Sequence, residues 1–201
     1  MADDCCASKA DDLERLAGDA RQRRVLMIVL AINALMFVLE FGAGVIAGSS
    51  ALMADAADML GDALVYGVSI YALARSARWK AGAAMFKGLF ILLLGVGAIV
   101  NALLKIGSGV PPSSTWMLSF GGLALVANLS CLALLWRFRR HDLNMASTFE
   151  CSRNDVMSNA GVLAAAGLVA LTASPWPDIL VGGAIALIIA GVVTLNLQGA
   201  H

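Results

Sequence analysis

The sequence predicts an all-α integral membrane protein, a bundle of six transmembrane helices with both termini in the cytoplasm. Of its 201 residues, 60% are hydrophobic and 14% are charged, and the mean hydropathy of +0.82 lies far outside the range of soluble domains. A helix needs about 20 apolar residues to cross a bilayer. Six such stretches occur, at 25–47, 51–74, 83–105, 116–136, 148–173 and 176–196.

Short polar or turn-forming segments separate these stretches. A Gly-Ser break precedes the second, and the later links are SARWKAG, GSGVPPSST, RFRRHDLNMAS and ASPWPD, whose prolines suit a tight turn. We expect residues 1–20 to form a cytoplasmic N-terminal tail and residues 21–197 to form the six-helix transmembrane domain. We expect no C-terminal cytosolic domain.

The distribution of Lys and Arg sets the predicted orientation. Residues 1–20 have no apolar core or cleavage site, so the first span is retained. Basic clusters precede span 1 and follow spans 2 and 4, whereas the opposite side has Lys105 alone. This predicts a multi-pass protein of the cell (inner) membrane. The net charge of zero says nothing about nucleic acid, but the basic residues form three separate juxtamembrane clusters, so we expect no nucleic-acid partner.

Acidic residues inside two predicted spans are candidates for function. Asp55, Asp58 and Asp62 are spaced i, i+3, i+7 and lie on one face of a helix. Cys151 and Asp155 are spaced i, i+4 and also share a face. A charge inside a membrane is costly, usually faces the bundle interior or a water-filled path, and is a functional hypothesis by default.

A divalent cation fits this pattern, because span 2 contains no Lys or Arg to neutralise its acids. Asp58 and Asp62, together with Cys151 and Asp155, supply an O/O/S/O set that suits tetrahedral Zn²⁺ or Cd²⁺. The thiolate argues against Mg²⁺ and Ca²⁺. The empty site would carry a formal charge of about −4, so protons should replace the metal as it leaves.

The sequence resembles the cation diffusion facilitator family of metal/proton antiporters. The resemblance rests on N33…E40-F-x-x-G…G-S-x-A-L-x-A-D55-A-A-D58-x-x-x-D62 and on C151-S-R-N-D155. Members carry paired (His/Asp)-x-x-x-Asp motifs in spans 2 and 5, and here Cys151 stands where His or Asp is usual, which should admit Cd²⁺ beside Zn²⁺. Most members also have a cytosolic ferredoxin-like domain, which we do not expect after span 6.

The resemblance implies efflux of Zn²⁺ or Cd²⁺ in exchange for H⁺ by alternating access, in metal homeostasis. It implies no enzymatic activity and no prosthetic group, only the bilayer and divalent metal ions as partners. A homodimer would be held by its transmembrane helices. Four further residues could support the metal ligands, line the path of the ion or form interhelical hydrogen bonds: Asp55, Asn33, Glu40 and Asn159. Cys5 and Cys6 could capture metal in the cytoplasm, or belong to a solvated tail.

Three other functions remain open. Metal binding without coupled transport needs the same residues, and a channel or a purely structural bundle would not need a metal. An intramembrane aspartyl protease is favoured only weakly. The L-G-D at 60–62 has Met59 where a G-x-G-D motif has its first Gly, and no Tyr precedes Asp155.

Overall fold

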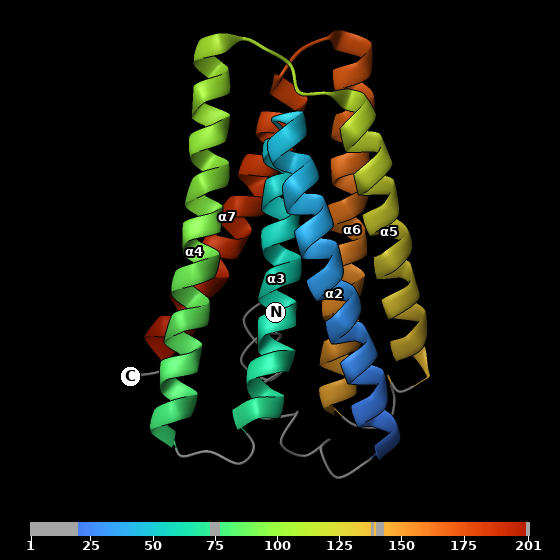
Figure 1. The fold of residues 1–201 in the computed structure, drawn as a ribbon, viewed down its shortest axis with the longest axis vertical. Coiled ribbons are helices and arrows are strands. Elements are labelled where there is room, and N and C mark those ends of the chain that lie inside the picture. The colour runs from blue at the N-terminus through green and yellow to red at the C-terminus, as the bar shows by residue number, and fades with distance from the viewer. Residues whose placement is uncertain (1–19, 73–76, 138, 140–142, 200–201) are drawn as a thin grey trace.

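The computed structural model describes the backbone of residues 20–72, 77–137, 139 and 143–199, and the side chains of most of these. Residues 1–19, with Cys5 and Cys6, lie outside the described part. The described residues form six α-helices and no strand (Figure 1). The helices are α2 (Ala20–Ala47), α3 (Ser50–Ala72), α4 (Ala77–Ser108), α5 (Ser114–Trp136), α6 (Leu143–Thr172) and α7 (Trp176–Gly199).

The six helices run alternately up and down in one bundle (Figure 1). The α2–α3, α4–α5 and α6–α7 junctions lie at one end, called here the upper end. The first residues of α2 and the last residues of α7 lie toward the other, lower end (Figure 1). Each predicted span corresponds to one helix, which confirms the all-helical fold. That the termini are cytoplasmic stays a prediction.

Helix length and apolar character agree with a membrane bundle. Three described segments, Arg24–Ala47, Ser114–Trp136 and Ser152–Thr172, are long and apolar enough to cross a membrane. Two others, Leu92–Ser108 and Trp176–Ile189, are apolar but shorter. Segment α3 differs because its three acids interrupt the apolar run. Large apolar side chains cover the outside of the bundle: Leu171 is 85% exposed, Leu104 69% and Leu187 68%. Such a surface suits contact with lipid and not with water.

Helix α3 lies at the centre, in contact with α2, α4, α6 and α7. Its upper half is buried on every side, and Ala51, Ala54, Ala56 and Ala57 are all fully buried. Small side chains let neighbouring backbones come close, which is how helices pack in membranes. The closest approach is at Gly182 of α7, where a Cβ would lie 2.6 Å from the backbone carbon of Ser50.

Two glycines in the left-handed conformation end helices at the upper end of the bundle. Gly48 (φ +64°) follows α2, and Gly109 (φ +65°) follows α4. A residue in this conformation ends a helix, because it turns the backbone so that N–H groups beyond the helix donate to its last carbonyl groups. The backbone of Ser113 before α5 donates to the carbonyl of Ala47 at 3.0 Å. The α4–α5 link is therefore bonded to the C-terminal end of α2.

Candidate functional site

The predicted metal-binding carboxylates lie near the middle of helices α3 and α6. Asp58 and Asp62 project from α3 and Asp155 from α6, and these two helices pack together. All three side chains are partly exposed. Asp62 and Asp155 both act electrostatically on the thiol of Cys131, a buried free cysteine on α5. An acid from each of the two sequence motifs therefore lies within electrostatic range of the same thiol on a third helix.

The fourth predicted ligand, Cys151, lies on α6 one turn before Asp155. Its side chain is outside the described part of the chain. Among the described side chains, no three His, Cys, Asp or Glu residues are close enough together to hold a metal ion. The four-ligand site of Asp58, Asp62, Cys151 and Asp155 therefore stays a prediction.

A second group of polar residues lies deeper, and we call it the central polar cluster: Glu40 of α2, Asp55 of α3, Asn128 of α5 and Asn159 of α6. All four residues are buried, and each is at most 3% exposed. Asn128 Nδ2 donates to Asn159 Oδ1 at 3.3 Å, and Asn159 Nδ2 donates to Asp55 Oδ2 at 2.5 Å. The chain of hydrogen bonds joins α5, α6 and α3 at one level.

Glu40 completes the central polar cluster without joining this chain of hydrogen bonds. Its carboxylate interacts electrostatically with Asp55. Among the described residues, no donor forms a hydrogen bond with either carboxylate oxygen of Glu40, and the nearby Ser158 hydroxyl also forms none. Asn33, the other residue predicted beside the pathway, donates instead to the carbonyl of Val29 in its own helix at 3.1 Å. Three of the four predicted residues thus come together, and Asn33 bonds elsewhere.

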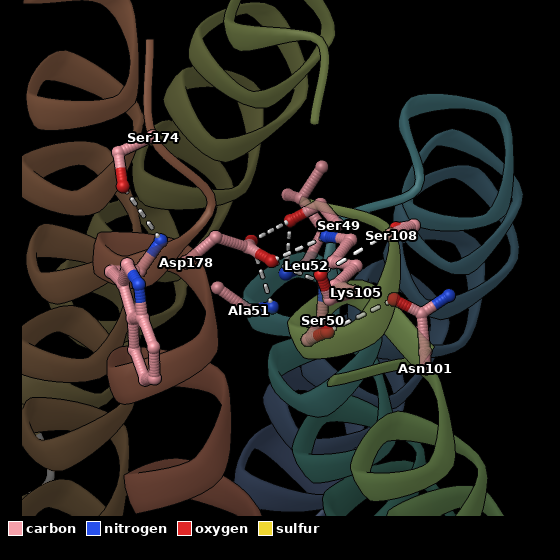
Figure 2. A network of polar contacts seen from close by, with 10 residues as sticks. Ser49, Ser50, Ala51, Leu52, Asn101, Lys105, Ser108, Ser174 and Asp178 are labelled. Carbon is pink, nitrogen blue, oxygen red and sulfur yellow. Dashed lines mark hydrogen bonds and ion pairs between the residues drawn. The ribbon is translucent and has the colours of Figure 1, made fainter. Parts of the chain in front are cut away.

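A third polar group ties the helices together at the upper end, and we call it the upper network (Figure 2). Asp178 of α7 is fully buried and accepts from the Ser49 hydroxyl at 2.5 Å and from the backbone N–H groups of Ser50 and Ala51 at 2.9 and 3.1 Å. Lys105 of α4 pairs with the same carboxylate at 2.7 Å. The carboxylate therefore caps the N-terminus of α3 and holds α4 against it.

Sequence reasoning missed Asp178 as a polar anchor and missed that Cys131 lies within electrostatic range of the predicted metal-binding acids Asp62 and Asp155. A signal for Asp178 was present, because it and Lys105 are single charges of opposite sign at span ends on the same predicted side. Cys131 gave no signal, because a cysteine in an apolar run resembles any small buried side chain.

Comparison with known proteins agrees with this architecture. Residues 26–195 match the family model described as the cation efflux transmembrane domain. Over 167 residues the chain is 28% identical to the metal cation efflux system protein CzcD of Cupriavidus metallidurans and, equally, to the cation efflux system protein CzcD of Alcaligenes sp.. The alignments cover 77% of this chain and 53% of each relative, so the chain spans about half their length.

The family match extends over all six helices and includes both acidic motifs, Asp58 to Asp62 on α3 and Cys151 to Asp155 on α6. The chain therefore belongs to the cation diffusion facilitator family of metal cation efflux proteins.

Proposed function

We propose that this chain carries divalent transition-metal ions, Zn²⁺ and Cd²⁺ among them, outward across the inner membrane in exchange for protons. The observation that carries the proposal is the position of Asp58, Asp62 and Asp155. They are partly exposed carboxylates from two packed helices inside a bundle with an apolar exterior. Carboxylates at that depth suit a cation that binds and leaves.

Proton exchange follows from charge. Carboxylate and thiolate ligands bind metal only when deprotonated, and the emptied ligands cannot all stay ionised in a poorly hydrated bundle. Each departing ion is therefore replaced by protons, and a proton gradient can drive the cycle. The carboxylates would be transport ligands and not catalytic acids.

The burial pattern supports alternating access. The carboxylates near the middle of the bundle are partly exposed, whereas the central polar cluster above them and Asp178 at the upper end are buried. With the lower end in the cytoplasm, this is the arrangement of a carrier open to the cytoplasm and closed outside. Outward release would require the upper network to separate. We also propose that two copies associate through their transmembrane helices.

Metal flux into vesicles tests the proposal. The purified chain is reconstituted in liposomes with a pH gradient, and Zn²⁺ and Cd²⁺ uptake is followed for the wild type and for Asp155→Asn. A matched control is Ser130→Ala on the exposed face of α5, whose hydroxyl only bonds to its own helix at Val126. We expect wild-type and control flux to follow the gradient and Asp155→Asn to fall to the level of empty vesicles.

Two other results would contradict the proposal. Flux that ignores both the gradient and Asp155→Asn would refute carriage by these residues. Calorimetric binding of Zn²⁺ without any flux would leave metal binding as the function. Titration with Zn²⁺, Cd²⁺, Co²⁺, Ni²⁺ and Fe²⁺ in the same preparation identifies the cargo, since ligand softness ranks these ions differently.

A further inference from the structure

The central polar cluster contains two acids whose environment does not match that of the metal-binding carboxylates. Glu40 is 0% exposed and Asp55 is 2% exposed. The two carboxylates lie close together, from α2 and α3, and neither oxygen of Glu40 accepts a hydrogen bond from a donor group in the described part of the chain. A buried ionised carboxylate without a donor or a counter-charge is among the most costly arrangements in a protein, so its charge must be neutralised.

No fixed positive charge is available for that role in the described part of the chain. Lys105 of α4 is bound to Asp178 of α7 at the upper end. Arg24 on α2, Arg137 after α5 and Arg153 on α6 are exposed. Arg139, also after α5, lies over the ring of Trp136. The remaining ionisable groups described on the helices packed around the pair are acids and a thiol: Asp58 and Asp62 on α3, Asp155 on α6 and Cys131 on α5. When ionised, these groups would repel the negative charge of the pair and would not neutralise it.

The hydrogen-bonded side-chain amides of Asn128 and Asn159 favour different protonation states for the two acids. Asn159 Oδ1 is occupied by the Asn128 donor, so its Nδ2 faces Asp55 and donates to Oδ2. A donated hydrogen bond favours the ionised form of Asp55. Both acids are buried, but Glu40 accepts no hydrogen bond from an amide or another described donor. One proton held on Glu40, directed toward Asp55, reduces the charge of the pair from −2 to −1.

We propose that Glu40 and Asp55 form a proton-binding site, separate from the metal ligands, with Glu40 as the group that carries the proton. Asp55 acts as its acceptor, held in place by Asn159. The site lies above the metal ligands, since Asp55 precedes Asp58 by three residues, or about 4.5 Å along α3. A divalent cation arriving at Asp58 repels the proton, and Glu40 then releases it to water as H⁺ and becomes a carboxylate.

The occupancy of this site does not depend on transport, but its part in coupling rests on the proposed metal/proton exchange. Two measurements therefore separate the ideas. Infrared difference spectroscopy of the metal-free protein in nanodiscs detects the C=O band of a protonated carboxylic acid, which shifts in D₂O. We expect the band at pH 7 in the wild type, its loss in Glu40→Gln and its persistence in Asp58→Asn, which removes a carboxylate one turn away.

Further variants keep this test decisive if Glu40→Gln folds poorly. Glu40→Asp retains an acid at the position and should keep a band at a shifted frequency. Overall folding is checked by thermal unfolding and by Zn²⁺ calorimetry. A wild type without the band, or a band that survives Glu40→Gln, would overturn the proposal. Loss of the band in Asp58→Asn would also overturn it, because the proton would then belong to the metal ligands.

Coupling is measured separately in vesicles, as protons moved per Zn²⁺. We expect Glu40→Gln to bind Zn²⁺ and to move about one proton fewer per ion, because its amide cannot release one. An unchanged proton count would remove Glu40 from the exchange. If the wild-type flux ignores the pH gradient while the infrared result holds, metal/proton exchange fails and the proton site stands.

Discussion

Replacing Asp178 by Asn removes one charge from the upper network with little change in volume. In the wild type, Asp178 Oδ1 accepts from Ser49 and Ala51, and Oδ2 accepts from Ser50 and Lys105. The Asn amide nitrogen cannot accept, so one pair of donors loses its partner. Lys105, whose side chain is only 9% exposed, also loses the negative charge beside its ammonium group.

The expected loss of stability can be estimated from these contacts. Breaking a buried ion pair by removing one partner costs about 3–5 kcal/mol, because a buried charge is left uncompensated. We expect about 3 kcal/mol for Asp178→Asn, since the long Lys105 stem at the end of α4 can turn its ammonium toward water. Lys105→Met should cost less, about 1–2 kcal/mol. Asp178 would keep three donors and the favourable N-terminus of α3.

Equilibrium unfolding in mixed detergent, followed by circular dichroism, measures both variants and the double variant Lys105→Met/Asp178→Asn. We expect the double variant to be more stable than Asp178→Asn alone, because it no longer buries an unpaired ammonium. Equal destabilisation by the two single variants would refute the reasoning that the α3 N-terminus stabilises Asp178. A change below about 0.5 kcal/mol for Asp178→Asn would mean that the ion pair is as weak as one on an exposed surface.

Two further predictions concern helix packing and metal choice. Gly182→Ala places a Cβ 2.6 Å from the Ser50 backbone carbon and forces α7 away from α3, at a cost of about 1–3 kcal/mol, whereas Gly183→Ala meets nothing within 4 Å and should change unfolding by less than about 0.5 kcal/mol. Equal effects of the two variants would contradict the close contact. Cys151→His should lower the preference for Cd²⁺ over Zn²⁺ by about tenfold in calorimetry, because imidazole is a harder ligand than thiolate; an unchanged ratio would exclude Cys151 as a ligand.

The order and extent of the helices were predictable because a bilayer requires long apolar runs. The span expected at 51–74 is α3, Ser50–Ala72. The span expected at 83–105 is α4, which begins earlier, at Ala77. Hydropathy marks the apolar part of a helix, but backbone hydrogen bonds continue into polar segments, so both ends of α4 extend beyond the apolar run.

The partners of the polar residues were less predictable. Periodicity places Asp58 and Asp62 on one face of α3 but does not identify what that face meets. Asp55 was expected to support the metal ligands, line the pathway or bond to another helix. It is more buried than Asp58 and Asp62, and it bonds to Asn159, 104 residues away. Pairings across such separations are set by how helices pack in three dimensions. A single sequence therefore shows which face of its helix a polar residue lies on, but not which other helix that face contacts.

The acids inside this bundle differ in what balances their charge, and this difference separates structural from transport roles. Asp178 is balanced by Lys105 and by the backbone of α3, groups that belong to the protein and cannot leave. Under the proposed function, Asp58 and Asp155 are balanced by a cargo ion, and Glu40 by a proton, both of which exchange with water. A fixed counter-charge resists movement, whereas an exchangeable one changes the free energy of the site in each step of a cycle. Neutralising Asp178 should therefore act mainly on stability, and neutralising Glu40 or Asp155 mainly on flux.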